Sequence, residues 1–195
     1  MSPLSRFDFQ TFCPVPRPWA LLAEAGPPAV QVGTPFTLRR VEGATRSIPG
    51  RAKLRAGLEE ELHKAAGRPI LWRESKKGPE VLEQIRHKDV GVSVSYSRRE
   101  AWLALGWMGA IGVDAVELEE VPDWREVAAI YLEQAARQRL RNSPQPALAF
   151  AREWAGFEAR LKLAGLSLQE GVKPPPALVY GAALGPVYVA IALAL

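Results

Sequence analysis

The sequence predicts an α+β fold, because three patterns follow one another along the chain. Apolar residues recur at helical spacing in the first third and again after the middle, a strict alternation of apolar and polar residues marks the centre, and two apolar runs flank a Gly-Pro turn near the C-terminus. This order of elements indicates two similar α+β halves built on one plan. We expect them to be residues 1–106 and 107–195, packed as one compact unit with the linker near Gly106–Gly109.

The composition is that of a globular protein, and 195 residues are enough to bury a sizeable core. A net charge of +4 suits an acidic partner, but the arginines are spread along the whole chain, so a solvated basic surface is the simpler explanation. Cys13 has no partner for a disulfide and is expected to be a small buried side chain. Without a signal sequence or a long apolar run, we expect a cytoplasmic protein with no membrane contact.

Seven prolines interrupt residues 1–50, so only short strands are expected there, around Val30–Val32 and Phe36–Val41. The first clear helix is Arg51–Ala66, which carries leucines at helical spacing and is followed by Gly67, a residue that commonly ends helices. A strand over Pro69–Arg73 follows.

The centre of the chain predicts a three-stranded antiparallel meander. Its strands are expected at residues 90–97, Ala101–Trp107 and Ala110–Leu118. Asp123 then stands where an N-cap would begin a helix that runs to Arg141. The remaining elements are a helix at 147–164 ended by Gly165 and strands at 177–182 and 186–193.

One stripe of the 147–164 helix combines an aromatic side chain, an acid and a base. Trp154, Glu158 and Lys162 are spaced four apart and therefore lie along one face. An ordinary amphipathic helix with a surface Glu-Lys pair would give the same spacing, so this alternative stays open.

Asp114 interrupts an otherwise apolar strand, and a charge in such a place needs a partner or a metal. Asp114 and Glu158 together would offer Mg²⁺ two oxygen ligands and leave positions for water and a substrate phosphate. Lys162, one turn beyond Glu158, would contact the same phosphate, and the hydroxyl of Ser95 would donate to it. Solvated acids at the end of a strand are the plainer alternative.

Taken in order, these features resemble the 4′-phosphopantetheinyl transferases, especially the Sfp-type branch. That branch shows a Ser-His-Ser strand end, a Gly-Ile/Val-Asp strand and a helix reading Trp-x-x-Lys-Glu-Ala-x-x-Lys. The matching segments here are Ser95-Tyr96-Ser97, Gly112-Val113-Asp114 and Trp154-x-x-Phe157-Glu158-Ala159-x-x-Lys162, and Lys76-Lys77-Gly78-Pro79 is similar to the family's Gly-Lys-Pro turn.

The resemblance implies two halves related by a pseudo-twofold axis, with coenzyme A and Mg²⁺ in the cleft between them. The reaction would move 4′-phosphopantetheine from coenzyme A to a serine of an apo acyl or peptidyl carrier protein and release 3′,5′-ADP. Asp114 and Glu158 would hold the metal, Glu158 would help to deprotonate the serine, and Lys162 would neutralise phosphate charge. The residues expected around the nucleotide end of coenzyme A are Arg51, Arg55, Lys77, Ser95 and Tyr96.

Three positions depart from the Sfp-type pattern. Tyr96 replaces the histidine, Phe157 replaces the lysine before the helix glutamate, and Val116 stands where a second strand acid is usual. The order Asp114-Ala-Val-Glu117 is closer to the holo-carrier-protein synthase branch, which has a two-carboxylate metal site. The alternative function is therefore a catalytically impaired homologue that binds coenzyme A or a carrier protein without turnover.

A nucleic-acid-binding protein is a third possibility from another class, but the sequence has no recognisable motif of that kind and no concentrated basic stripe. We therefore expect no nucleic-acid partner. Because both halves of the cleft lie in one chain, we expect a monomer.

Overall fold

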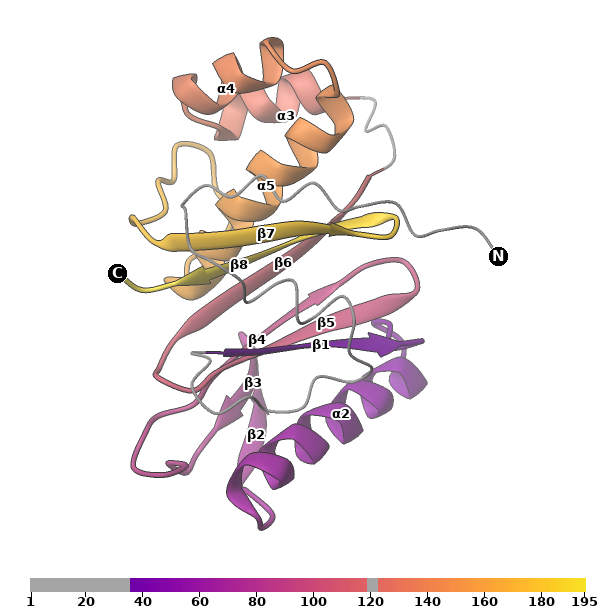
Figure 1. Ribbon diagram of the computed structural model, residues 1–195, viewed down its shortest axis with the longest axis vertical. Helices are drawn as coiled ribbons and strands as arrows, with labels where there is room; N and C mark the ends of the chain where they lie inside the picture. Colours follow the sequence, from indigo (N-terminus) through magenta and orange to yellow (C-terminus); the bar gives the residue numbers. More distant parts are fainter. Residues whose placement is uncertain (1–35, 119–122) are drawn as a thin grey trace.

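The computed structural model describes residues 36–118 and 123–195, which form a mixed α+β fold of antiparallel sheets and helices (Figure 1). The α+β class predicted from the sequence is confirmed. Cys13 and the strand expected at Val30–Val32 lie outside the described residues. The helices and strands are β1 (Phe36–Glu42), α2 (Ile48–Ala66), β2 (Trp72–Ser75), β3 (Gly78–Val81), β4 (Gly91–Tyr96), β5 (Glu100–Gly106), β6 (Ile111–Glu117), α3 (Trp124–Tyr131), α4 (Gln134–Arg141), α5 (Pro146–Leu163), β7 (Leu178–Leu184) and β8 (Val187–Leu193).

The first sheet has the antiparallel order β1-β5-β4, and α2 covers one of its faces. The helix begins after Ser47, whose side chain accepts a hydrogen bond from the Gly50 amide, and it ends at Gly67, which has a φ of 72°. The predicted helix is confirmed, with a start three residues earlier than expected. Its buried face includes Leu54, Leu58 and Leu62.

The predicted meander is wrong in its third strand, because β6 pairs with β8 and not with β5. β5 already bonds to β1 along one edge and to β4 along the other, so it has no edge left for β6. The chain instead leaves the first sheet after Gly106, passes through Gly109 at a φ of 120°, and enters a second sheet at Ile111. Neighbouring strands in the sequence are usually paired, which is why the pattern alone indicated a meander.

The second sheet has the antiparallel order β6-β8-β7, and α5 packs on one face of it. In both sheets the strand that comes last in the chain lies in the centre. The predicted helix at 147–164 and the two C-terminal strands are confirmed to within a few residues, and Gly165 ends the helical segment at a φ of 64°.

Gly112 in β6 allows α5 to lie directly on the sheet. A Cβ atom at this position would stand 1.9 Å from the carbonyl oxygen of Ala159 and 2.7 Å from the amide nitrogen of Leu163. Only glycine therefore fits, and the close approach brings the polar residues of α5 next to those of β6.

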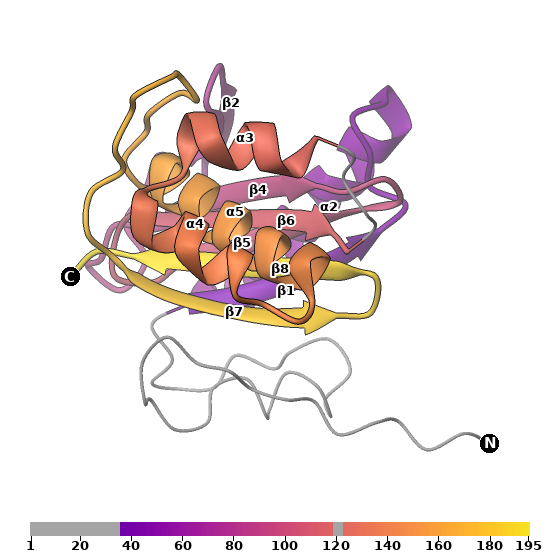
Figure 2. The ribbon, with the colours of Figure 1, turned by 90° about the horizontal axis from the view of Figure 1, so that it is seen from above.

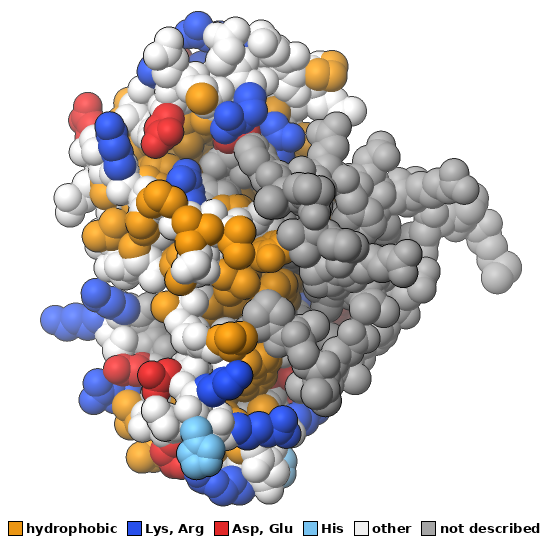
Figure 3. Space-filling model, turned by 60° about the vertical axis from the view of Figure 1, so that its left-hand side comes forward, with side chains coloured by type: hydrophobic (Ala, Val, Ile, Leu, Met, Phe, Trp, Pro, Cys, Tyr) orange, Lys and Arg blue, Asp and Glu red, His pale blue; other side chains and the backbone are white. Residues whose placement is uncertain are grey.

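The helix predicted from Asp123 to Arg141 is two helices, α3 and α4. Leu132 and Glu133 have extended backbones with ψ near 143° and 157°, and the break lets both short helices pack on α5. No glycine or proline marks this break in the sequence. Asp123 stands at the N-cap as predicted, but its side chain makes no capping hydrogen bond. Figure 3 shows charged side chains of both signs gathered over this helical end of the molecule.

The two sheets pack face to face, so the molecule is layered as α2, first sheet, second sheet and α5, with α3 and α4 outermost (Figures 1 and 2). β4 and β6 lie side by side at the edge of this sandwich. The hydroxyl of Ser93 accepts a hydrogen bond from the Val113 amide at 3.0 Å, which ties the two strands together.

The remaining strands, β2 and β3, form a hairpin that turns at Lys76 and Lys77. The strand expected at Pro69–Arg73 overlaps β2 only at its end, and β3 was not expected. Within the described part of the chain, no helix is both long and apolar enough to cross a membrane.

Candidate functional site

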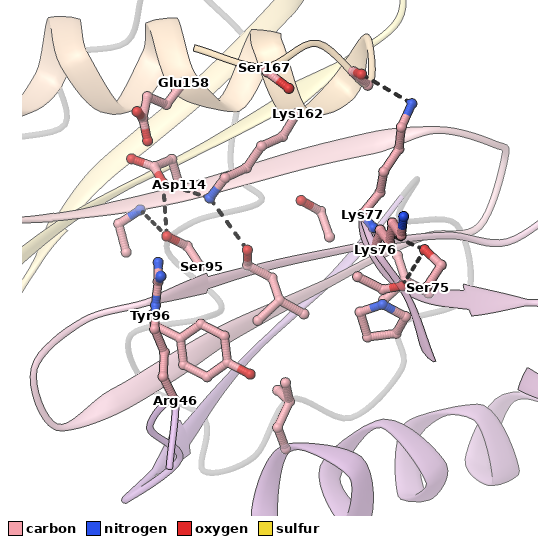
Figure 4. Close-up of a pocket in the computed structure, with 18 of the residues that line it drawn as sticks. Arg46, Ser75, Lys76, Lys77, Ser95, Tyr96, Asp114, Glu158, Lys162 and Ser167 are labelled. Carbon is pink, nitrogen blue, oxygen red and sulfur yellow. Dashed lines mark hydrogen bonds and ion pairs between the residues drawn. The ribbon is translucent and has the colours of Figure 1, made fainter. Parts of the chain in front are cut away.

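A cavity of about 910 Å³ opens where β4, β6 and α5 meet, and Figure 4 shows its residues. The two strands and the helix form its floor. Its rim comes from the start of α2, the β2–β3 hairpin and the loop that follows α5. The cavity therefore draws on segments that are distant in the sequence and on both sheets.

Asp114 lies on the floor with only 4% of its surface exposed. Its Oδ1 atom accepts hydrogen bonds from the hydroxyl of Ser95 at 2.8 Å and from Nζ of Lys162 at 2.7 Å. The Ser95 oxygen in turn accepts from the Ala115 amide at 3.1 Å. A buried carboxylate needs such donors to stay charged, so the partner expected for Asp114 is present in the protein itself.

Lys162 is fixed by three acceptors, which equals the number of protons on its ammonium group. Besides Asp114, its Nζ atom donates to the carbonyl oxygens of Val113 at 3.0 Å and Val94 at 3.4 Å. Lys162 thus connects α5 to both strands of the floor.

Glu158 faces Asp114 from α5 (Figure 4). Burial raises the pKa of Glu158 to about 7, the negative charge of Asp114 and a hydrogen bond between the two carboxyl groups add to the rise, and Lys162 opposes it. Lys162 makes its ion pair with Asp114, so Glu158 feels the ammonium charge without a direct contact to it. A carboxyl group with a raised pKa is suited to accept or donate a proton near neutral pH.

The stripe predicted on the helix is confirmed, since Trp154, Glu158 and Lys162 all line the cavity. Phe157, the residue that replaces the lysine of the Sfp-type pattern, does not line the cavity. Phe157 is 2% exposed and packs in the hydrophobic cluster of α3, α4 and α5 on another side of the helix. A lysine at this position would be buried among apolar side chains, so the departure from the family pattern at residue 157 serves packing.

The strand positions after Asp114 alternate between the two faces of the sheet. Val116 packs in the cluster formed with α5, on the same face as Asp114, while Glu117 accepts a hydrogen bond from the Arg98 amide at 3.0 Å. No second strand acid therefore joins Asp114 on its face, although Glu117 reaches the wall of the cavity.

Basic residues line the rim of the cavity. Arg51 and Lys77, both expected there, line it, and Nζ of Lys77 donates to the Gly165 carbonyl at 3.3 Å. Arg55 does not line it; its guanidinium forms a two-point ion pair, at 2.9 and 2.7 Å, with Glu74, which does line it. Two further basic residues of the wall, Arg46 and Lys76, were not expected from the sequence.

Tyr96 and Ser95 both line the cavity, but in different settings. The guanidinium carbon of Arg46 lies 5.8 Å from the centre of the Tyr96 ring, and burial raises the pKa of Tyr96 against the opposing charge of Arg51. Ser95 is 5% exposed and its hydroxyl is committed to Asp114, so donating to a phosphate would require that bond to be exchanged.

The roles of some residues of this site could not be predicted from the sequence. In the sequence, Ser93 is one of several polar residues of a strand, but in the structure its hydroxyl holds β4 to β6. Arg46 stands in a loop before α2, and only the fold brings it above Tyr96.

The donor chemistry fits a hard divalent cation. Two carboxyl groups face each other and one ammonium group pairs with Asp114, so full ionisation leaves one negative charge that a proton or a metal ion can balance. Within residues 36–118 and 123–195, no group of three or more His, Cys, Asp or Glu side chains is placed to hold a metal ion.

Comparison with known proteins adds no family assignment: no protein family model matches the chain, and no curated protein matches its sequence significantly.

Proposed function

We propose that the protein transfers 4′-phosphopantetheine from coenzyme A to a serine of an apo acyl or peptidyl carrier protein. The observation that carries this proposal is the buried Asp114–Glu158 pair, held with Lys162 on the floor of a large cavity that has a basic rim. Such a site suits a ligand with several phosphates and a proton transfer at its centre.

The strand orders of the two sheets support the proposed pseudo-twofold plan. In each half of the chain, the first strand of the sheet is followed by a helical segment and then by two strands that form a hairpin. The last of these strands lies in the centre of the sheet. Under this proposal the halves are residues 1–106 and 107–195, and the cavity lies where they meet.

Coenzyme A would bind with its phosphates between the floor and the rim. Lys77, Lys76 and Arg51 offer charged donors to the nucleotide end, and the cavity volume of about 910 Å³ leaves space for a substrate of that size. Tyr96, held by Arg46, would offer its ring or hydroxyl to the same end of the ligand.

Asp114 and Glu158 are the residues that would hold Mg²⁺, which when bound supplies positive charge to the pyrophosphate. Ser95 holds the Asp114 carboxylate in its orientation, and the main-chain contacts of Lys162 fix the ammonium group beside it.

The chemical step follows from the substrate and products. The carrier serine oxygen attacks the phosphorus that bears the pantetheine arm, the bond from that phosphorus to the bridging oxygen breaks, and 3′,5′-ADP leaves with the bridging oxygen. Deprotonated Glu158 would take the serine proton, a role that the raised pKa of this half-buried carboxyl group supports. Lys162 stabilises negative charge that develops on the phosphates.

The experiment is incubation of the protein with coenzyme A, Mg²⁺ and a panel of apo carrier proteins, followed by intact-mass spectrometry. We expect one carrier to gain one phosphopantetheine group. Glu158→Gln should lower the rate by about 10²-fold or more, whereas Glu170→Gln in the exposed loop after α5 should leave the rate unchanged. Near-normal transfer by Glu158→Gln would overturn the assignment of the base.

One observation favours a second candidate, a protein that binds coenzyme A or a carrier protein without turnover. The Oδ1 atom of Asp114 and the ammonium group of Lys162 already satisfy each other, which leaves them less available to a metal and a phosphate. Saturable coenzyme A binding combined with no transfer to any carrier in the panel would select this candidate.

A further inference from the structure

A second cavity, of about 330 Å³, lies on the opposite side of α5, between this helix, α4 and the β7–β8 hairpin. Gly156 and Arg160 line it from α5. At 100° per residue these positions point about 120–160° away from Trp154, Glu158 and Lys162. The second cavity is thus separate from the first and shares only the helix with it.

Glu153 lies at the charged end of this cavity, and both of its oxygen atoms are used. Arg139 binds them in a two-point ion pair at 2.8 and 2.8 Å, and Arg152 lies 3.3 Å from Oε1. This carboxylate, 7% exposed in its side chain, is therefore satisfied by two guanidinium groups.

Arg160 is the third guanidinium of the cavity wall, and it has no acidic partner within 4.0 Å in the described residues. Its only hydrogen bond there is a long one, 3.4 Å from Nε to the Gly156 carbonyl of its own helix. Burial lowers the pKa of Arg160, although Glu133 and Glu153 oppose the effect from a distance. A half-buried guanidinium without an ion pair is unfavourable, so an anion at this position would be stabilised.

Tyr188 adds a neutral donor to the same cavity. It is 8% exposed, and its hydroxyl makes no hydrogen bond to any described residue. Burial raises the pKa of Tyr188 to about 12, so the hydroxyl keeps its proton at any physiological pH. The oxygen lies against Gly181, a residue of the same wall, where a Cβ atom would stand only 2.5 Å from it.

The rest of the wall is apolar. It includes the side chains of Phe157, Val179 and Leu178, which form a surface for the hydrocarbon part of a ligand. The volume is about one third that of the first cavity, which limits the ligand to a small molecule.

From this arrangement we propose that the second cavity binds a small organic anion, whose carboxylate or phosphate group accepts hydrogen bonds from Arg160 and Tyr188 and whose apolar part packs on Phe157 and Val179. The site is independent of the transferase proposed above, since it uses none of the residues of the first cavity.

Isothermal titration calorimetry with three probes tests this site: inorganic phosphate, phenyl phosphate and benzoate. We expect the two aromatic anions to bind more tightly than inorganic phosphate, because only they reach the apolar wall. Arg160→Gln should weaken their binding by about tenfold or more, Arg160→Lys by less, and Tyr188→Phe by about threefold.

Two control variants separate this site from other basic surfaces. Arg141→Gln removes an exposed arginine at the end of the neighbouring helix α4, and Arg51→Gln removes a rim residue of the first cavity. Neither should change aromatic-anion binding by more than about twofold. No saturable binding, or binding that Arg51→Gln weakens and Arg160→Gln does not, would overturn the proposal. If Arg160→Gln fails to fold, unchanged binding by Tyr188→Phe and Arg160→Lys together would overturn it.

Discussion

At the scale of single residues, the site consists of two carboxyl groups, Asp114 and Glu158, and one ammonium group, Lys162. Asp114 pairs with the one fixed cation, Lys162, and also accepts a hydrogen bond from the hydroxyl of Ser95. Burial and the negative charge of Asp114 make Glu158 keep a proton to a higher pH than a free glutamate does. The buried pair explains why the strand tolerates an acid, and it makes stability depend on pH.

We predict that the free energy of unfolding falls as the pH rises from about 4.5 to about 7, the unfolded and folded pKa values of Glu158. A raised carboxyl pKa means that the folded state binds the extra proton in this interval, so the stabilisation is complete below it and lost above it. After allowance for partial solvent exposure, the loss is about 1–2 kcal/mol. Urea titrations at pH 5 and pH 8 measure it, and Glu158→Gln should flatten the dependence. If the free energy of unfolding of Glu158→Gln depended on pH as strongly as that of the unmodified protein, a group other than Glu158 would be responsible.

Lys162→Met should destabilise the protein, because Asp114 would lose its cation while staying 95% buried in its side chain. We expect a loss of about 2–3 kcal/mol, below the value for a fully buried pair since a third of the Lys162 side chain is exposed. Chemical denaturation measures it, with Lys173→Met in an exposed loop as the matched control. Adding Asp114→Asn to Lys162→Met should recover part of the loss, whereas strictly additive losses would show that the two residues do not interact.

At the scale of helices and strands, the geometry depends on how closely α5 approaches β6. The helix carries Glu158 and Lys162, the strand carries Asp114, and Gly112 is the residue that lets their backbones meet. The spacing of the helix stripe could be predicted from the sequence because it is local. The partner strand could not, because β6 pairs with a strand about 75 residues later and nothing in its own sequence specifies that partner.

Gly112→Ala should push α5 away from β6, because the new Cβ atom would lie 1.9 Å from the Ala159 carbonyl oxygen. We expect a loss of about 3 kcal/mol, together with loss of the pH dependence attributed to Glu158. Gly156→Ala is the matched control on α5: its nearest neighbour would be a flexible methyl group of Val179 at 3.5 Å. That variant should be neutral or gain about 0.5–1 kcal/mol from helix propensity. Equal effects of the two substitutions, measured by thermal unfolding, would contradict the close-packing explanation.

At the scale of the whole molecule, the cavity exists because two sheets stack and place the start of α2 and the β2–β3 hairpin opposite α5. Alternation in the centre of the chain and apolar runs elsewhere were enough to find the strands of both sheets, since both are local properties. The roles of Arg46, Ser93 and Phe157 could not be found this way. Each depends on a contact between distant segments: Arg46 with Tyr96, Ser93 with β6, and Phe157 with the helices that break at Leu132.

The basic rim predicts that coenzyme A binding depends on salt. Arg46, Arg51, Lys76 and Lys77 line the cavity, and charges on an open rim are screened over about 10 Å at 0.1 M salt. We expect affinity to fall by about tenfold between 0.05 and 0.5 M salt. Arg51→Gln and Lys77→Gln should reduce this dependence, whereas Lys88→Gln, on an exposed part of the chain outside the cavity, should not. Salt-independent binding would argue against contact between the rim and the phosphates.

The most direct measurement of the central claim is a calorimetric titration of coenzyme A with and without Mg²⁺, on the unmodified protein and on Asp114→Asn. If Asp114 and Glu158 hold a metal against the pyrophosphate, Mg²⁺ should tighten binding by about tenfold or more in the unmodified protein and by less than about twofold in Asp114→Asn. Absence of coenzyme A binding, or equal tightening by Mg²⁺ in both proteins, would contradict it.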